Sequence, residues 1–163
     1  MATEWLDGEQ LDVWVRLRAV MELLPAALDS QLRRSADLTY FEYYVLAMLS
    51  EADERTLRMS ALAARTNATL PRLSHVVRKM ADRSLVDRSP DPEDGRSVRV
   101  HLTGTGYDVL VAAAPGHVGA VRRFVFDQLD EEQVGQLGSV ADAMLERLDP
   151  EGVLTHEYRR PPA

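Results

Sequence analysis

Apolar residues recur at alternating spacings of three and four near both ends of the chain, the period of an amphipathic helix. The first stripe consists of Trp14, Leu17, Met21, Leu24 and Leu28. It predicts a helix from Gly8 to Arg34 that kinks at Pro25. The second stripe consists of Val134, Leu137, Ala141, Met144 and Leu148. It predicts a last helix, which begins after the capping pair Asp130 and Gln133.

Three shorter helices are expected in the middle of the chain, and a long one follows. A capping box of Thr39 and Glu42 predicts a helix that ends near residue 50. The next helix spans 60–67, and the third begins near Thr69 with Pro71 in its first turn, where proline is tolerated. Beyond position 103, apolar periodicity predicts a long helix to about 129 that is interrupted by a proline at 115.

Between these helices, two short strands at 85–88 and 98–102 flank the segment "DPEDGRS", in which Asp94-Gly95 is a strong β-hairpin signal. In the second strand, Val98, Val100 and Leu102 alternate with Arg99 and His101, so that the first three are expected to face inward. Two short helices and a tight turn before a hairpin are typical of a winged helix-turn-helix.

The predicted fold is therefore mostly α, a single winged helix-turn-helix domain over 9–148. Its dimerisation helices are expected at about 9–34 and 104–148, and its DNA-reading unit at about 39–103. The segment 149–163 is assigned as a C-terminal tail. The two end stripes suit helix-on-helix packing between subunits, although each could instead cover the core of its own domain.

The second helix of the reading unit has one apolar and one polar face. The side expected to be buried carries Leu70, Leu73, Val76, Val77 and Met80. The other side carries Pro71, Arg72, Ser74, His75, Arg78 and Lys79. Cations and hydroxyls on an exposed helix can bind phosphates and base edges in a major groove. A solvated helix face of ordinary composition would look the same.

Charge is distributed unevenly along this acidic chain, whose net charge is -7. Residues 67–103 contain seven basic and five acidic side chains, whereas the remainder contains 12 basic and 21 acidic ones. A local basic surface on an acidic body is compatible with DNA binding at that surface alone. It lies where the reading unit is predicted.

Other chemistry finds little support. There are no cysteines, and the four histidines, at 75, 101, 117 and 156, lack the spacing of two metal ligands on one helix face. His117 is expected at the surface or at a helix cap. We expect neither an enzyme, a metal site nor a cofactor. No apolar run approaches the roughly 18 residues of a membrane span, so a cytoplasmic protein is expected.

The wing carries the most specific pattern: Asp94-x-Arg96-x-x-x-Val100-x-Leu102-Thr103, followed by Gly106. With the preceding "LSHVVRKMADRSLVDR", it resembles the MarR family of transcriptional regulators. The resemblance implies a homodimer that binds a pseudo-palindromic operator, usually as a repressor. It implies that Arg96, oriented by Asp94, enters the minor groove. It places Thr69, Arg72, Ser74, His75 and Arg78 at the major groove or its phosphates, and Pro71 is a departure from the family's recognition helix. The further candidates for DNA binding are Pro71, Lys79, Ser97 and Arg99.

Many members of that family release DNA when a small aromatic or phenolic acid binds between the dimerisation helices and the reading unit. Candidate residues for such a site are Trp14, Arg18, Met21, Tyr40, Tyr44 and Met48, with Arg18 holding a carboxylate. Aromatic and methionine residues at helical spacing more often belong to a core.

A second function also stays open, that of a winged-helix module that binds protein rather than DNA. The two functions differ in how binding affinity depends on salt, because only contacts with phosphates make it fall steeply.

Overall fold

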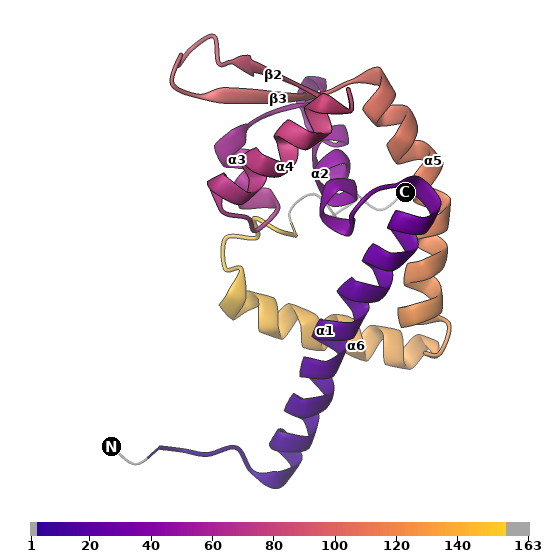
Figure 1. The fold of residues 1–163 in the computed structure, drawn as a ribbon. Coiled ribbons are helices and arrows are strands. Elements are labelled where there is room, and N and C mark those ends of the chain that lie inside the picture. The colour runs from indigo at the N-terminus through magenta and orange to yellow at the C-terminus, as the bar shows by residue number, and fades with distance from the viewer. Residues whose placement is uncertain (1–2, 156–163) are drawn as a thin grey trace.

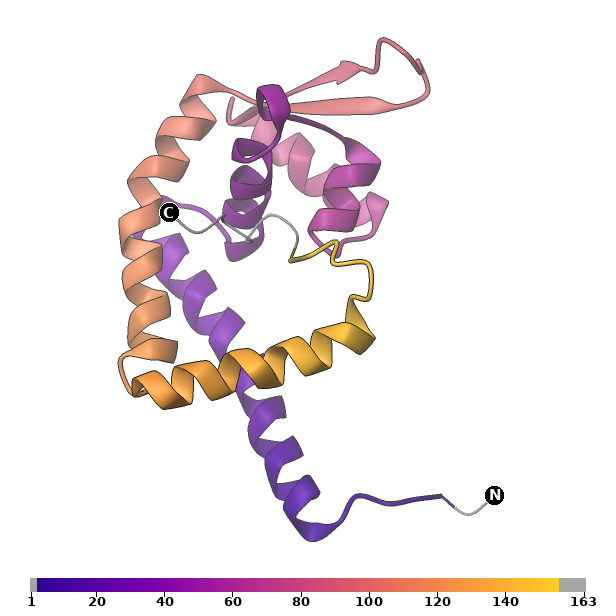
Figure 2. The same ribbon diagram turned by 180° about the vertical axis from the view of Figure 1, so that it is seen from behind.

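The computed structural model describes residues 3–155, which form a mostly helical fold with one small sheet (Figures 1 and 2). The elements are α1 (Gly8–Ala36), α2 (Tyr40–Ser50), η1 (Asp53–Arg55), β1 (Thr56–Arg58), α3 (Met59–Arg65), α4 (Leu70–Asp82), β2 (Val86–Pro90), β3 (Val98–Leu102), α5 (Gly104–Val121), η2 (Arg122–Phe126) and α6 (Glu131–Leu148). The helix pair α3–α4 followed by the β2–β3 hairpin confirms the predicted winged helix-turn-helix. Of the expected tail, residues 156–163, including His156, lie outside the described residues.

Capping boxes begin the helices where the sequence predicts them. At α2, the Glu42 amide donates to Thr39 Oγ1 (3.0 Å) and the Thr39 amide donates to Glu42 Oε2 (2.7 Å). At α6, Asp130 and Gln133 make the same reciprocal pair. Each pair satisfies amides that the first helical turn leaves free, which fixes these two helix starts.

The long helix before α6 is interrupted later than expected. α5 continues through Pro115, so the predicted break at that residue is wrong, and α1 likewise continues through Pro25. The break comes at η2, a π-helical turn from Arg122 to Phe126. A proline removes one backbone hydrogen bond, and the surrounding α-helical bonds are enough to continue the helix. The wider turn at η2 contains no proline or glycine from which a break in the helix could have been predicted.

A third strand, β1, was not predicted. It pairs antiparallel with β3, which lies in the middle of the sheet order β1-β3-β2. β1 has three residues, too few to show an alternating pattern. The two residues before it, Glu54 (φ 50°) and Arg55 (φ 53°), adopt left-handed backbone conformations that the sequence does not signal.

The turn of the wing also differs from the predicted tight hairpin. β2 ends at Pro90, which pairs with Val98, so residues 91–97 form a longer loop. Gly95 does not adopt a positive φ, as a two-residue turn of the primed types would require. The loop closes instead through hydrogen bonds from the Asp91 amide to the Ser97 carbonyl (2.8 Å) and from the Ser97 amide to the Asp94 carbonyl (2.8 Å).

The hydrophobic core lies in the reading unit and along the adjoining part of α5. Its fully buried members include Leu38, Leu46, Leu49, Leu62, Leu73, Val77, Met80, Val86, Val100 and Leu102. Gly106 brings α5 against this core, since a Cβ at that position would collide with the Leu85 carbonyl oxygen and approach Leu102 Cδ1 to 2.8 Å. The small residue therefore lets α5 begin directly beside β2.

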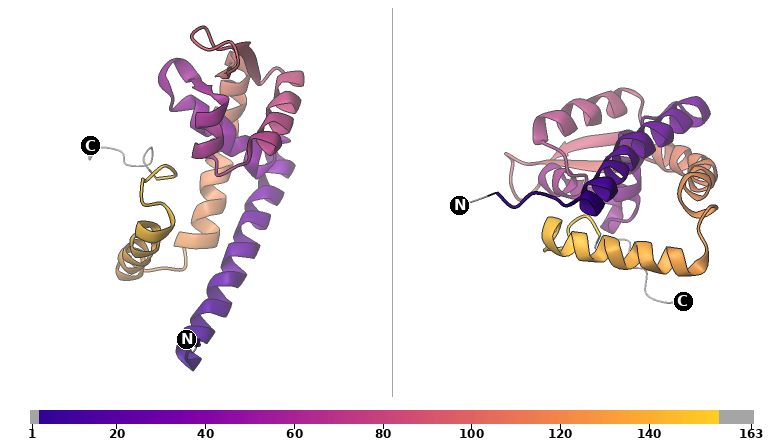
Figure 3. Two further views of the ribbon diagram at one scale, coloured as in Figure 1. Left: turned by 90° about the vertical axis from the view of Figure 1, so that its left-hand side faces the viewer. Right: turned by 90° about the horizontal axis from the view of Figure 1, so that it is seen from below.

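The last helix, α6, stands apart from the rest of the described chain (Figure 3). It makes few contacts with the other elements, and none of its residues is buried. Its whole predicted stripe is exposed, including Leu137 (44%) and Met144 (40%). Within one subunit, then, this stripe does not cover the core of its own domain.

One helix changes the expectation about membrane spans. Gly104–Phe126, 23 residues with a mean hydropathy of 1.3, is long and apolar enough to cross a membrane by length and composition. The expectation that no run would approach that length was wrong. A single such helix is weak support for a membrane protein, because core and interface helices have the same composition. Here the helix packs along α1 and α2.

Candidate nucleic-acid interface

The recognition helix α4 is held by its apolar side. Leu73, Val77 and Met80 are fully buried, and Val76 is half-buried. The prediction for Leu70 was wrong, because this side chain is 51% exposed. Leu70 is the first residue of α4, and this end of the helix lies beyond the edge of the core. The remaining buried positions fix which face of α4 is presented to solvent.

The turn between α3 and α4 sets the angle of the recognition helix. Asn67 adopts the left-handed conformation expected of it (φ 46°). Thr66 is buried and its Oγ1 donates to the Leu62 carbonyl (2.7 Å), which ties the turn to the end of α3. Thr69 stands at the N-cap of α4, but its side chain makes no capping hydrogen bond. Its exposed hydroxyl is therefore not committed to the helix end.

Most of the predicted DNA-facing residues of α4 are exposed together. Those on the surface are Pro71, Arg72, His75, Arg78 and Lys79, and Ser74 is half-buried. Arg72 is the exception in its contacts, since its guanidinium carbon lies 4.5 Å from the centre of the Phe41 ring. A cation over an aromatic face is attracted to it, so Arg72 is partly held by α2.

Asp94 organises the wing loop through the backbone. Its carboxylate accepts hydrogen bonds from the Arg96 amide (3.1 Å) and from Ser97 Oγ (2.7 Å). The Ser97 hydroxyl and the Arg96 amide lower the pKa of Asp94, which keeps it ionised. Asp94 thus orients the chain that carries Arg96 rather than the guanidinium that the resemblance implies it would hold. The Arg96 side chain is exposed.

A cleft of about 310 Å³ separates the wing from the helix pair. Its lining residues are Met59, Ser60, Leu70, Ser74, Arg88, Arg96, Ser97 and Val98. Two guanidiniums and three hydroxyls line it, and no acidic residue does. Arg88 and Ser60 were not predicted from the sequence as DNA-binding residues. Arg88 was only counted among the seven basic residues of 67–103. Its location at this cleft could be found only from the register in which β2 pairs with β3.

Arg99 lies elsewhere on the wing. It is half-buried, and its Nε donates to Asp91 Oδ2 (3.0 Å) at the base of the loop. It lies on the face of the sheet opposite the buried Val100 and on the same face as His101, as the alternation predicted. The alternation did not predict its ion pair with Asp91, which covers part of the Arg99 side chain.

The six candidate ligand residues do not form one cluster in the described chain. Met48 is buried in the core, and Tyr40 and Tyr44 pack against that core. Tyr44 also donates its hydroxyl to the Arg65 carbonyl (3.2 Å). The remaining three lie on α1: Trp14 and Met21 are about half exposed, and Arg18 pairs with Glu22 (2.8 Å).

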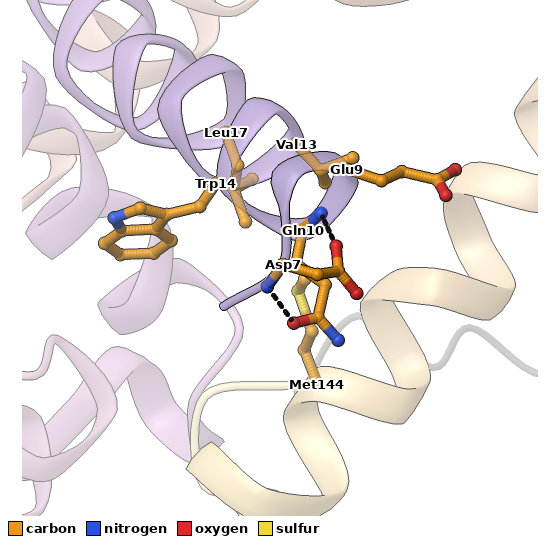
Figure 4. A pocket seen from close by; sticks show the side chains of 7 residues that line it. All are labelled: Asp7, Glu9, Gln10, Val13, Trp14, Leu17 and Met144. Carbon is orange, nitrogen blue, oxygen red and sulfur yellow. Dashed lines mark hydrogen bonds between the residues drawn. The ribbon is translucent and has the colours of Figure 1, made fainter. Parts of the chain in front are cut away.

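A separate groove of about 500 Å³ lies between the start of α1 and α6 (Figure 4). It is lined by Asp7, Glu9, Gln10, Val13, Trp14, Leu17 and Met144. In Figure 4, Asp7 and Gln10 form the capping box that begins α1, while Met144 reaches it from α6. The groove is thus a seam between the two predicted dimerisation helices.

His117 is neither at the surface nor at a helix cap, so that expectation was wrong. It lies within α5, and its ring packs on Tyr43 (centroids 4.4 Å apart) and near Tyr40 (5.9 Å). Burial lowers the pKa of His117. Its Nδ1 is buried without a hydrogen-bond partner, as is Oε1 of the buried Gln31 on α1. Across residues 3–155, no group of three His, Cys, Asp or Glu could hold a metal ion.

Comparison with known proteins identifies the family. The model of the MarR family matches residues 36–97, from the end of α1 to the wing loop. Sco3205 of Streptomyces coelicolor, a MarR family transcriptional regulator solved in complex with DNA, is 40% identical with a TM-score of 0.87, covering 91% of this chain and 93% of that one. The chain belongs to the MarR family of transcriptional regulators. Its known relatives are regulators and not enzymes, in agreement with the sequence analysis.

Three other proteins extend the comparison. The HTH-type transcriptional regulator ML2140 of Mycobacterium leprae is 30% identical over 85% of this chain and 97% of its own length. The HTH-type transcriptional repressor IacR of Pseudomonas putida is 28% identical over 73% of this chain and 70% of its own. BpsR of Bordetella bronchiseptica, whose DNA binding is regulated by 6-hydroxynicotinic acid, shares the fold at 21% identity and a TM-score of 0.71, over 82% of this chain and 98% of that one.

Proposed function

We propose that this MarR family regulator is a homodimer that binds a pseudo-palindromic operator through α4 and the wing. One observation carries the proposal: the guanidiniums of Arg88 and Arg96 line an acid-free cleft together with Leu70 and Ser74 of α4, the helix with the exposed basic face, on an otherwise acidic protein. Because DNA is a dense array of phosphates, a surface that binds it must concentrate cations and exclude carboxylates. The cleft meets both conditions.

The contacts follow from the placement of each element. α4 presents Arg78, Lys79 and His75 on one exposed face, which suits the major groove and its phosphates. The projecting wing presents Arg96, which suits a narrow minor groove because its negative potential attracts arginine. Arg88 and Ser60, between the two, are suited to the phosphate backbone that separates the grooves.

The dimer is proposed from the apolar surface that one subunit leaves uncovered. Leu137 and Met144 on α6 face solvent, as do Trp14 and Met21 on α1. Exposed apolar patches of this extent on neighbouring helices mark interaction surfaces. A two-fold axis through these helices would place the recognition helices about 34 Å apart, one turn of DNA.

The direct test is binding to DNA from upstream of the protein's own gene, measured by fluorescence anisotropy across a salt titration with a scrambled duplex as control. We expect tighter binding to the native sequence and a log affinity that falls linearly with log salt. Binding that is independent of salt or of sequence would favour the alternative, a winged helix that recognises protein.

The wing contact is tested by Arg96→Ala, for which we expect operator affinity to fall by about 1–3 kcal/mol with the fold and dimer intact. Arg34→Ala is the matched control, since Arg34 is an exposed arginine at the end of α1. It should leave operator affinity unchanged. Equal affinity for wild-type and Arg96→Ala protein would remove the wing from the interface.

Repression and effector control belong to the same proposal. IacR is named a repressor, and BpsR responds to an aromatic acid. An effector that favours a recognition-helix spacing unlike that of the operator would release DNA by its differential affinity. A small aromatic or phenolic acid is the proposed class of effector. The proposed compartment is the cytoplasm, where bacterial DNA lies.

A further inference from the structure

The base of the wing contains a carboxylate that is removed from solvent. The side chain of Asp91 is 0% exposed, although it belongs to a surface loop. Its Oδ2 accepts hydrogen bonds from Arg58 Nε (2.6 Å) and Arg99 Nε (3.0 Å). Its Oδ1 accepts one from the Glu93 amide (2.9 Å). Three donors therefore surround one acid.

The donors come from different parts of the sheet. Arg58 ends β1 and stands immediately before α3, whereas Arg99 lies on β3. The two are register partners across the β1–β3 pair, so their guanidiniums converge on the carboxylate from neighbouring strands. Asp91 itself is the first residue of the loop after β2. The Arg58–Asp91–Arg99 cluster, as we call it, thus joins β3, the wing loop and the start of α3.

The charges in this cluster are stable over the physiological range. Hydrogen bonds from the Glu93 amide, Arg99 and Arg58 hold the pKa of Asp91 far below its usual range, and Asp91 in turn raises the pKa of Arg58. Arg58 also donates Nη2 to the Glu93 carboxylate (2.9 Å), which is exposed. The cluster is a permanent ionic link and not a switch that titrates.

The loop that this cluster anchors is the one that carries Arg96. From Asp91 the chain runs through Asp94 and Arg96 to Ser97, whose carbonyl accepts from the Asp91 amide and closes the loop. α3, which Arg58 precedes, supports the recognition helix α4. A fixed distance between wing and α4 matters for DNA binding, because both must reach their grooves at once.

We propose that the Arg58–Asp91–Arg99 cluster positions the wing relative to the recognition helix, and that Asp91 and Arg99 act on DNA binding through Arg96. This inference rests on the proposed function of Arg96 as a groove contact. Arg99, which was predicted to bind DNA, is then a positioning residue.

The test is a double-mutant cycle on operator affinity that combines Asp91→Asn with Arg96→Ala. Asp91→Asn keeps the size of the side chain but turns an NH₂ group or an uncharged oxygen toward two guanidiniums. We expect a loss of about fivefold to tenfold in operator affinity in the wild-type background. In the Arg96→Ala background, Asp91→Asn should not lower operator affinity further, because the arginine that the cluster positions is already absent.

A matched control separates positioning from charge. Asp87→Asn makes the same change of charge on β2, at an exposed side chain whose register partner is His101. It should leave operator affinity unchanged or raise it slightly by reducing repulsion from phosphates. If both variants change affinity alike, or if the losses from Asp91→Asn and Arg96→Ala are additive, the positioning role is overturned.

Two further outcomes are distinguished from a failure of the positioning role. If Arg96→Ala itself has no effect, the proposed function of the wing fails, whatever Asp91→Asn does. If Asp91→Asn does not fold, the cycle is run with Arg99→Lys, which keeps the cation but loses the fork of donors. Non-additivity with Arg96→Ala then supports positioning, while an additive loss would make Arg99 an independent DNA contact.

Discussion

The reading unit and the dimerisation region differ in how they bury their apolar side chains. In α2, α4 and β3, the large apolar residues are enclosed by their own subunit, as Leu46, Leu73 and Val100 show at 0% exposure. In α6, by contrast, Leu137 and Val140 remain 44% and 53% exposed. The first region is complete within one chain. The second has the apolar composition of a core but leaves those side chains exposed, and this is the surface that the proposed dimer would cover.

The largest effect is expected from breaking the dimerisation region alone. Leu137→Glu places a charge in the α6 stripe and should convert the dimer to monomers, because a buried unpaired charge is strongly unfavourable. Operator affinity should then fall by about 100-fold, since each monomer binds one half-site without the gain from linkage. Light scattering and anisotropy measure the two changes.

Ser139→Glu is the matched control for that substitution. It introduces the same charge two residues along α6, on the face away from the stripe, and should leave the dimer and operator binding intact. A dimer that survives Leu137→Glu would place the subunit interface elsewhere. The reading unit should stay folded in both variants, which far-ultraviolet circular dichroism can report.

A smaller effect is expected where α5 leaves the reading unit. Gly106→Ala brings a Cβ against the Leu85 carbonyl oxygen, and backbone cannot move aside as a side chain can. We expect a loss of about 1–3 kcal/mol in the free energy of unfolding, measured in urea. Gly104→Ala is the control, because a Cβ there meets nothing within 4 Å. The free energy of unfolding of that variant should rise by up to about 1 kcal/mol, because alanine has the higher helix propensity. A Gly106→Ala protein as stable as the wild type would contradict the close approach of α5 to Leu85.

The same two regions show what the sequence can reveal. Local chemistry was enough for the helix starts at Thr39 and Asp130, because a capping box lies within four residues. It was also enough for the buried side of α4, apart from Leu70 at its first turn. These features depend on neighbours along the chain.

What sequence reasoning missed depends on residues far apart. Asp91 and Arg58 are separated by 33 positions, and they meet because the sheet order β1-β3-β2 places β1 and the loop after β2 in one sheet. The alternation predicted the outward face of Arg99 correctly, but not its ion pair with Asp91 on that face. The break at η2 and the place of His117 between two tyrosines likewise follow from packing of whole helices rather than from any local signal.

The smallest effect is expected at His117, where α5 meets α2 between the two regions. Burial lowers the pKa of His117 below its usual 6.5. As the pH falls below 6.5, the unfolded chain therefore takes up this proton before the folded one does, and the free energy of unfolding decreases. Above that range the imidazole is neutral in both states, and the contribution vanishes.

His117→Phe keeps a ring against Tyr43 and removes the titrating group together with its unpaired Nδ1. We expect the stability of this variant to fall less than that of the wild type between pH 7 and pH 5, as measured by urea unfolding at each pH. His75→Gln, which alters an exposed histidine on α4, should keep the full wild-type decrease. If His117→Phe and wild type lose stability in parallel, the proton is taken up elsewhere, and the junction between the two regions is insensitive to pH.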